Sequence, residues 1–321
     1  MKTYLVTGGA GFIGSTLTDK LLRDNNKVIV VDNFCDYYNP KIKENNISTF
    51  LNNRNFKLYF ADIRDRNKIS RVFDENDIDV VVHLAAMVGV RPSIDNPMLY
   101  QDVNCNGTQN ILEEARLHGV SNIVMASSSS VYGNTKEIPF REDMVTDYPI
   151  SPYAATKKAT ELMGHVYHEL YGMNIIMLRF FTVYGPKQRP DLAITKFTNL
   201  MVNGKSIPMY GDGTTSRDYT YVDDIIHGII GSCEYELNSN GIYEIMNLGS
   251  SNPISLKEMI VTIGDILGIE PIIEQLPMQP GDVIKTYADI SKSRKLIKYN
   301  PETSFKTGVK KYVDWYKNNN R

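Results

Sequence analysis

The sequence has little of what membrane-spanning, nucleic-acid-binding or secreted proteins need. It contains no run of about 18 apolar residues, so no membrane span is expected. The formal net charge is −2 and no basic block occurs, so neither nucleic acid nor an anionic membrane surface is an expected partner. The first residues lack a basic segment followed by a long apolar stretch, so no secretory signal is expected.

Cysteine is also scarce. The three cysteines, Cys35, Cys105 and Cys233, are odd in number and far apart in the chain. This usage indicates reduced thiols and a cytoplasmic location, and it argues against a disulfide framework or a zinc site. With 321 residues, 42% of them hydrophobic and 22% charged, the chain has the composition of a globular protein of one or two domains.

Short apolar runs alternate with longer amphipathic stretches in the first half of the chain. This alternation predicts an α/β fold of the Rossmann type, a doubly wound parallel sheet with helices on both faces. Uniformly apolar strands are typical of such a sheet, because both of its faces are buried. The expected strands are 3–8, 27–32, 56–62, 78–85, 121–127 and 173–180. The expected helices are 12–24, 66–76, 98–118 and 153–171.

The pattern changes after residue 185, where turn-rich segments separate shorter elements. Helices are expected at 255–267 and 305–317. We therefore expect a smaller C-terminal α/β region that binds the substrate, formed by 186–221 and 251–321. The Rossmann domain is expected to comprise 1–185 together with about 222–250, where the elements return to the first domain.

A glycine-rich turn follows the first expected strand. Gly8, Gly11 and Gly14 have the spacing G-x-x-G-x-x-G. Phe12 and Ile13, between the last two glycines, begin the first helix and are also expected to contact the cofactor. Glycines in such a turn let the backbone approach a pyrophosphate, which then lies at the N-terminus of the helix. The context of strand, turn and helix predicts a dinucleotide site.

Asp32 ends the second strand, 18 residues after Gly14. A carboxylate there accepts hydrogen bonds from ribose hydroxyls and repels a 2′-phosphate, which predicts NAD rather than NADP. Asp62, at the end of the third strand, is expected to meet the adenine. Other cofactor contacts are expected where neighbouring strands end, at Asn33, Ile63, Leu84, Ala85, Ala86 and Phe180.

Tyr153 and Lys157 are four residues apart on an expected helix, so their side chains lie on one face. An ammonium beside a phenol favours the phenolate and is expected to lower the pKa of the phenol. Such a tyrosine is suited to act as general base on a sugar hydroxyl. On its own, however, this spacing also fits two ordinary surface residues.

The order and spacing of the glycine turn, Asp32, "HLAA", "SSSSVYG" and "SPYAATKK" resemble the extended short-chain dehydrogenase/reductase family, in its nucleotide-sugar branch. The resemblance runs from Lys2 to about Tyr287. It implies that Tyr153 and Lys157 are catalytic, that Lys157 also contacts the nicotinamide ribose of bound NAD, and that Ser128 completes the site. It also implies a homodimer that pairs through 98–118 and 153–171.

Within this family the residues before "VYG" indicate the reaction. Family dehydratases carry an acidic pair there and decarboxylases a glutamate, whereas this chain has Ser129 and Ser130. Without an acid to assist elimination, hydride returned to the opposite face of a 4-keto sugar gives 4-epimerisation. A non-catalytic NAD-binding sensor is the alternative from another class. Such sensors tend to lose the tyrosine–lysine pair, which this chain keeps.

The resemblance favours UDP-glucuronate as the substrate. Thr182 stands where glucose epimerases usually have asparagine, and with Ser129 and Ser130 it is expected to hold the sugar carboxylate. Arg189 and Arg91 are expected to supply positive charge near the carboxylate or the diphosphate. The segments that resemble UDP-glucuronate 4-epimerases are 32–47, 89–93, 178–191 and 276–289.

Other features keep UDP-glucose open as the substrate, and a related hexuronate decarboxylase remains a third alternative. "YGDGTTSRDYTYVDD" has a form common to glucose epimerases and dehydratases. Arg217 is expected to pair with the diphosphate. Tyr210 is expected to lie against the uracil, and Asp282 to bind the uridine ribose. No metal site is expected, and the helical pair His165 and His168 is interpreted as solvent-facing or packing residues.

Overall fold

The computed structural model describes residues 1–277 and 284–319. Its centre is a seven-stranded sheet in the order β10-β6-β5-β4-β1-β2-β3, in which every neighbouring pair is parallel. The strands are β1 (Thr3–Thr7), β2 (Lys27–Asp32), β3 (Phe56–Phe60), β4 (Val80–His83), β5 (Asn122–Ser128), β6 (Asn174–Phe180) and β10 (Tyr243–Leu248). The predicted Rossmann-type α/β class is therefore confirmed.

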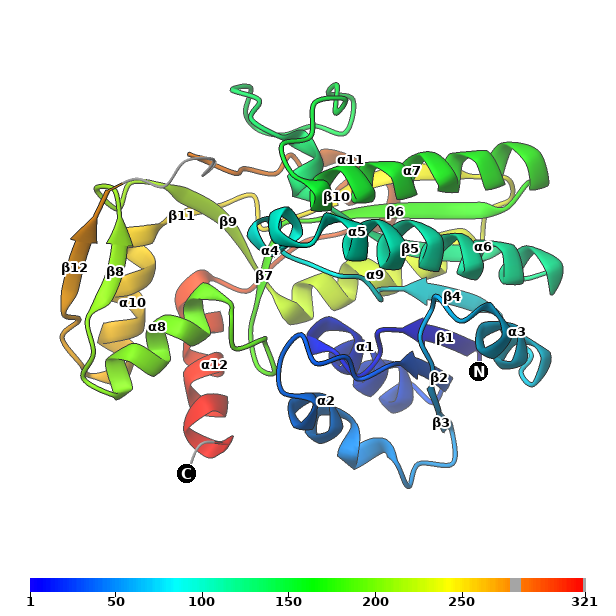
Figure 1. Ribbon diagram of the computed structural model, residues 1–321, viewed down its shortest axis with the longest axis horizontal. Coiled ribbons are helices and arrows are strands. Elements are labelled where there is room, and N and C mark those ends of the chain that lie inside the picture. Colours follow the sequence, from blue (N-terminus) through cyan, green and yellow to red (C-terminus); the bar gives the residue numbers. More distant parts are fainter. Residues whose placement is uncertain (278–283, 320–321) are drawn as a thin grey trace.

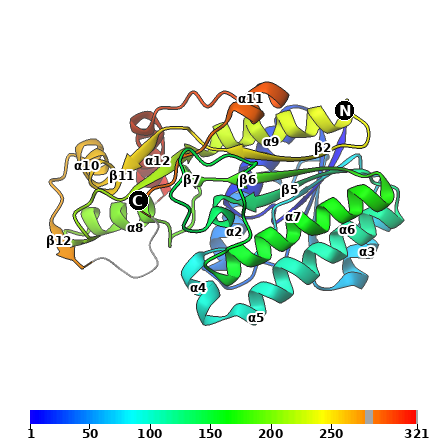
Figure 2. The same cartoon turned by 90° about the horizontal axis from the view of Figure 1, so that it is seen from above.

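Helices cover both faces of this sheet, and each face has its own apolar core. On one face lie α3 (Arg66–Asp74), α6 (Gly107–Leu117) and α7 (Pro152–Tyr171). On the other lie α1 (Phe12–Arg23) and α9 (Val222–Leu237), which pack against each other (Figures 1 and 2). Because the central strands are buried on both sides, their sequences are almost continuously apolar.

The helical stretch expected at 98–118 contains a break in regular geometry. It consists of α5 (Pro97–Tyr100), a π-helical turn η2 (Gln101–Asn106) and α6. Within the π turn, the Asn104 side chain accepts a hydrogen bond from the Met87 N–H (2.8 Å) and donates one to the Met87 carbonyl (3.0 Å). The turn thus holds the chain that follows β4. π-helical turns are frequently found at functional sites.

A smaller layer lies beyond the carboxyl ends of the large sheet (Figure 1). Its sheets are β11 (Pro253–Ser255), β9 (Ser216–Tyr221) and β7 (Thr182–Tyr184), and separately β12 (Ile273–Leu276) with β8 (Ile207–Tyr210). Three helices flank them, α8 (Ala193–Val202), α10 (Leu256–Leu267) and α12 (Phe305–Asn319). After β9 the chain returns to the large sheet, where β10 pairs with β6.

Five short elements complete the described secondary structure. They are α2 (Pro40–Ile47), η1 (Ser48–Phe50), α4 (Val90–Asp95), η3 (Ser129–Tyr132) and α11 (Ser291–Ile297). Among the residues that the structure describes, no helix combines the length and apolar character needed to cross a membrane.

A buried ion pair joins α7 to the sheet. The Arg179 guanidinium on β6 donates two hydrogen bonds to the Glu161 carboxylate on α7, at 2.8 and 2.9 Å, and both side chains are 1% exposed. The Ser127 hydroxyl donates a third bond to the same carboxylate (2.6 Å), and Arg179 also donates to the Tyr132 hydroxyl (3.0 Å). The pair therefore ties together α7, the ends of β5 and β6, and η3.

Replacing Glu161 by glutamine is expected to destabilise the fold by about 3 kcal/mol, because the buried Arg179 charge then lacks its counter-charge. The measurement is the free energy of unfolding in urea. Lys20→Gln is the control, since it removes a surface i,i+4 pair with Asp24 and is expected to cost less than about 0.5 kcal/mol. Equal losses in the two variants would contradict this role of the Glu161–Arg179 pair.

Candidate active site

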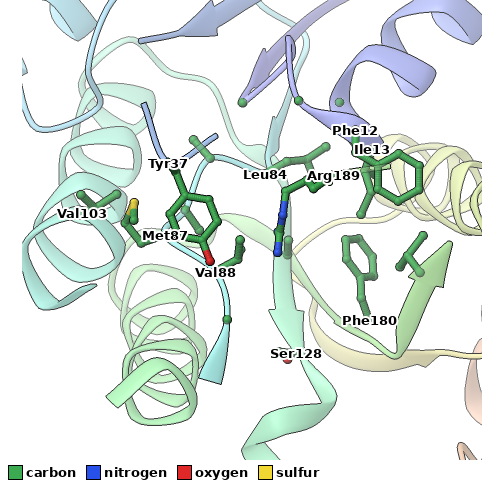
Figure 3. Close-up of a pocket in the computed structure, with 18 of the residues that line it drawn as sticks. Phe12, Ile13, Tyr37, Leu84, Met87, Val88, Val103, Ser128, Phe180 and Arg189 are labelled. Atoms are coloured by element: carbon green, nitrogen blue, oxygen red, sulfur yellow. The ribbon is translucent and has the colours of Figure 1, made fainter. Parts of the chain in front are cut away.

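A cavity of roughly 520 Å³ opens at the carboxyl ends of the large sheet, where doubly wound folds bind ligands (Figure 3). Most of the residues predicted from the sequence line this cavity. They are Gly8, Gly11, Phe12, Ile13, Gly14, Asp32, Asn33, Ile63, Leu84, Ala85, Ala86, Ser128, Ser129, Ser130, Tyr153, Lys157, Phe180, Thr182 and Arg189.

The glycine turn is packed too closely to accept side chains. Gly8 has φ +68°, and a Cβ placed there would lie 2.9 Å from the backbone nitrogen of Ala85. A Cβ on Gly14 would collide with the Gly8 carbonyl oxygen. Helix α1 begins directly after Gly11 without a side-chain cap, which leaves its first N–H groups available to an anion. This bare backbone cradle fits the pyrophosphate of a dinucleotide.

Asp32 is buried at the end of β2 and is held by the local backbone. Its carboxylate accepts hydrogen bonds from the N–H groups of Ala10 (3.2 Å) and Phe34 (2.9 Å). The Lys43 ammonium, carried by α2, lies 3.2 Å from the same carboxylate, and its side chain is only 8% exposed. Lys43 was not predicted from the sequence, since neither its spacing nor its neighbours mark it. Its charge weakens the repulsion that Asp32 alone would exert on a 2′-phosphate.

Asp62 does not line the cavity. Its carboxylate accepts hydrogen bonds from Asn33 (2.8 Å) and from the Arg64 guanidinium (2.9 and 3.0 Å). Mainly through the Arg64 hydrogen bonds, the pKa of Asp62 falls to about 2. The predicted contact of Asp62 with the adenine stays a prediction.

His83, at the end of β4, belongs to a hydrogen-bond network beneath the cofactor turn. The Thr7 hydroxyl oxygen accepts from the N–H groups of Leu84 and Ala85 (both 3.2 Å), so its own proton is left for His83 Nδ1 (2.7 Å). Nε2 then carries the ring proton and donates it to the Thr108 hydroxyl (2.9 Å). Burial lowers the pKa of His83 to about 3, so the ring is neutral and holds the backbone of Leu84 and Ala85 in place.

Tyr153 and Lys157 lie on the cavity side of α7, as their spacing predicts. The Lys157 ammonium donates to the Ala126 carbonyl oxygen (2.7 Å), and burial lowers its pKa to about 8. The expected fall in the pKa of Tyr153 is wrong for this structure. Burial of the phenol raises its pKa, and the opposing effects come from the Ser128 hydroxyl and the Arg189 charge rather than from Lys157.

The four serines divide their roles at the end of β5. Ser127 lines the cavity, but its hydroxyl donates to Glu161, whereas Ser128 ends the strand beside Tyr153. The Ser128 hydroxyl accepts from the Ser130 N–H and donates to the Ser130 hydroxyl, both at 3.1 Å. Ser129 and Ser130 then begin η3 and line the site with neutral hydroxyls.

The predicted substrate contacts are only partly brought together. Thr182 and Arg189 line the same cavity as Tyr153, whereas Arg91, Tyr210 and Arg217 do not. Tyr210 ends β8 and Arg217 lies in β9, both in the smaller layer, and Arg91 lies near the start of α4. Asp282 lies outside the described residues. The roles assigned to these four residues stay predictions.

The cavity also has residues that the sequence analysis did not identify. Tyr37 and Tyr38 reach it from the loop after β2, and Met87 and Val88 from the chain after β4. The Arg189 guanidinium lies over the Tyr37 ring, 5.5 Å from its centroid, and Figure 3 shows the two side chains side by side. The paired tyrosines of "DYYNP" were visible in the sequence, but nothing local indicates that they face the site.

No group of histidine, cysteine or acidic side chains suited to a metal ion occurs in the described part of the chain. His165 packs edge-on against Tyr243, with ring centroids 5.0 Å apart. His168 Nδ1 lies 2.9 Å from the Met173 carbonyl oxygen. Both histidines are thus engaged in helix packing, and the three cysteines are free thiols.

Comparisons with known proteins agree with this geometry. A family model described as GDP-mannose 4,6 dehydratase matches residues 5–312. A UDP-glucuronate 4-epimerase of Thermodesulfobacterium geofontis is 44% identical over 320 residues, which are 99% of this chain and 97% of that protein.

Two solved structures extend the comparison. UDP-glucuronic acid 4-epimerase from Bacillus cereus, in complex with UDP-glucuronic acid and NAD, superposes with a TM-score of 0.91 at 36% identity and covers 98% of this chain and 99% of its own. UDP-glucose 4-epimerase from Thermotoga maritima, with UDP-glucose, has a TM-score of 0.90 at 31% identity, with coverage of 99% and 100%.

Gly8→Ala is expected to abolish retention of the dinucleotide, because the new Cβ would push the Gly8 turn and the Ala85 backbone apart. The measurement is the amount of NAD that co-purifies with the protein. Gly119→Ala is the matched control: Gly119 has φ +71°, but a Cβ there meets nothing within 4 Å. It is expected to cost about 1 kcal/mol of stability and no cofactor. Full NAD retention by Gly8→Ala would refute the claim that this close-packed turn holds the pyrophosphate.

Lys157→Met is expected to stabilise the fold at pH 7 while abolishing turnover. The folded-state pKa of Lys157, about 8, lies below the ordinary lysine value, so burying the charged form costs stability at every pH below about 8. That cost disappears as pH rises from about 8 to 10.5. Urea midpoints of the variant and wild type should therefore converge over this interval, and Lys20→Met at the surface should show no such trend. A difference between the two urea midpoints that does not change with pH would contradict the claim that the buried charge of Lys157 costs stability.

Proposed function

We propose that this chain, which belongs to the NAD-dependent epimerase/dehydratase family of extended short-chain dehydrogenases/reductases, interconverts UDP-glucuronate and UDP-galacturonate. At the coarser level the chain is an NAD-dependent UDP-sugar 4-epimerase. The observation that carries the finer proposal is the set of neutral donors and one cation, Ser129, Ser130, Thr182 and Arg189, that lines the cavity with Tyr153.

The residues at the carboxyl edge of the large sheet, with the adjoining turns and helices, are suited to bind NAD. The glycine turn and the N-terminus of α1 would hold the pyrophosphate, and Asp32 with Lys43 would hold the adenosine ribose. Lys157 would reach the nicotinamide ribose from α7. When bound, NAD supplies a reversible acceptor for the hydride on C4 of the sugar.

Tyr153 is the group that moves a proton. We propose that its phenolate takes the proton of the sugar 4-hydroxyl and later gives it back to the same oxygen. Ser128, beside Tyr153, donates a hydrogen bond to that oxygen as charge builds on it. The Arg189 charge and the Ser128 hydroxyl both favour the phenolate over the phenol. The buried ammonium of Lys157 adds positive charge on the same helix face.

The residues around the sugar favour epimerisation over loss of water. Ser129 and Ser130 cannot act as carboxylic acids, and both lie in the cavity that holds Tyr153. A 4-keto hexuronate is a β-keto acid, so the C–C bond to its carboxylate must be kept from aligning with the carbonyl π system. Fixed donors from Ser130, Thr182 and Arg189 would hold the carboxylate in such a position.

UDP-glucose is the second candidate substrate. It is supported by the fold similarity to the Thermotoga maritima enzyme and by the form of the segment that contains Arg217. A glucose 6-hydroxyl would leave the Arg189 guanidinium without an anionic partner from the sugar, which is why the glucuronate proposal is preferred.

The proposal also includes a homodimer and a cytoplasmic location, both of which were expected from the sequence. A homodimer through α6 and α7 fits the exposed Leu162, Val166 and Leu170, which recur every four residues along α7. The cytoplasmic location expected from the cysteines stays a prediction.

The experiment is to incubate the purified protein separately with UDP-glucuronate and UDP-glucose and to resolve the products by chromatography. We expect UDP-galacturonate from the first and at most slow conversion of the second. Tyr153→Phe is expected to lower turnover by roughly 10²–10⁴-fold while NAD stays bound.

Interconversion of the glucose pair alone would refute the glucuronate proposal. A UDP-pentose as the main product would refute the argument from Ser129 and Ser130. Full activity of Tyr153→Phe would show that another group is the base.

A further inference from the structure

We infer that Asp191 is a positioning residue for substrate specificity: it fixes the Arg189 guanidinium so that one N–H edge is presented to an anionic substituent on the sugar. The inference rests on the proposed function, because it assumes that Arg189 binds such a substituent. Asp191 itself does not line the cavity, whereas Arg189 does.

The contact between the two side chains is bidentate. Arg189 Nε donates to Asp191 Oδ1 at 2.9 Å, and Nη2 donates to Oδ2 at 2.7 Å. The Asp191 side chain is 43% exposed and that of Arg189 only 18%. The carboxylate therefore holds the guanidinium from the solvent side, a geometry that fixes the plane of the arginine as well as its position.

The face of the same guanidinium lies over the Tyr37 ring, with 5.5 Å from Cζ to the ring centroid. Asp191 thus occupies one edge of the group and Tyr37 one face. Nη1 has no hydrogen-bond partner among the described residues, although it belongs to a largely buried side chain. The remaining donor edge is thus available to a ligand in the cavity (Figure 3).

The loop that carries both residues is itself held on two sides. The Gln188 side chain accepts from the Gly185 N–H (3.2 Å) and donates to the Thr195 hydroxyl on α8 (2.7 Å). The Lys187 ammonium crosses to the Asn46 carbonyl oxygen on α2 (3.2 Å). Because this loop is fixed, the direction of the Arg189 guanidinium depends mainly on Asp191.

The charge of Arg189 makes the direction of its guanidinium important for specificity. A nearly buried guanidinium without a partner is costly, and it would turn to any anion within reach, including the diphosphate that both candidate substrates share. With two of its N–H groups bound to Asp191, Arg189 keeps its full charge. An anion can then approach the guanidinium from only one direction. A sugar carboxylate in that direction gains a charge-assisted bond, whereas a sugar hydroxyl gains much less.

The test compares Asp191→Asn with wild type in full steady-state kinetics on both substrates. Asparagine keeps the shape but offers only one acceptor oxygen, and its amide N–H group faces the guanidinium. We expect KM for UDP-glucuronate to rise about tenfold, kcat to change less than twofold, and kcat/KM for UDP-glucose to stay within about twofold. Equal losses on both substrates would overturn the inference, because they would indicate a structural role.

Asp143→Asn is the matched control. Asp143 follows Arg141 by the same two positions and accepts from its Nε at 3.1 Å, but its side chain is 75% exposed and it lies outside the cavity. We expect this variant to leave both substrates unaffected. Thermal melting of both variants checks that each is folded, and Asp191→Ser serves as a second variant with a shorter side chain.

A double-mutant cycle separates action through Arg189 from any other action. In an Arg189→Ala background, Asp191→Asn is expected to add less than a twofold change in KM for UDP-glucuronate. A further tenfold rise there would overturn the inference, since Asp191 would then act on the substrate by another route.

A last measurement distinguishes failure of this inference from failure of the proposed function. If wild type converts only UDP-glucose, the proposed function fails. The inference is then tested by the inhibition constant of UDP-glucuronate against UDP-glucose turnover. It should rise about tenfold in Asp191→Asn, and an unchanged constant would overturn the role of Asp191.

Discussion

The buried ion pair between Glu161 and Arg179 determines where the reactive side chains lie. Tyr153, Lys157 and Glu161 recur every four residues along α7, so one helix face carries the base, the ammonium and the carboxylate that anchors the helix. Arg179 stands opposite Ser127 in the register of β6 and β5, and the same carboxylate binds both. Any shift of α7 along the sheet would break these bonds and separate Tyr153 from Ser128.

The cofactor side of the cavity is held by a different kind of contact. There the backbone itself is close-packed, with Gly8 against Ala85. The Thr7–His83–Thr108 network holds the backbone of Ala85 in place. A neutral His83 suits this task, because a charged ring beside Lys157 would add repulsion in a buried place. One side of the cavity thus depends on charge pairing and the other on uncharged hydrogen bonds.

Much of this arrangement could be predicted because the patterns are local. The glycine spacing, the apolar strands and the i,i+4 pair each depend on backbone geometry over a few residues, and all three are present in the structure. The π-helical turn at 101–106 was not predicted, because nothing in its sequence separates it from an ordinary helix. Lys43, on the short helix α2, and Tyr37, in the loop before it, were missed for a related reason: no periodic pattern marks either residue, and only folding brings them to the cavity.

The sequence by itself determined the order of the elements, the turn that accepts a pyrophosphate, and the side chains that meet at the end of β5. Tertiary structure decided the electrostatics. Burial raises the pKa of Tyr153 and lowers that of Lys157, so the residue spacing alone predicted the wrong direction for the phenol. Tertiary structure also decided that the Arg189 guanidinium lines the cavity while Asp191 binds it from the solvent side, although the two residues are near neighbours in the chain. Spacing along a chain is local, whereas desolvation and charge pairing depend on everything packed around a group.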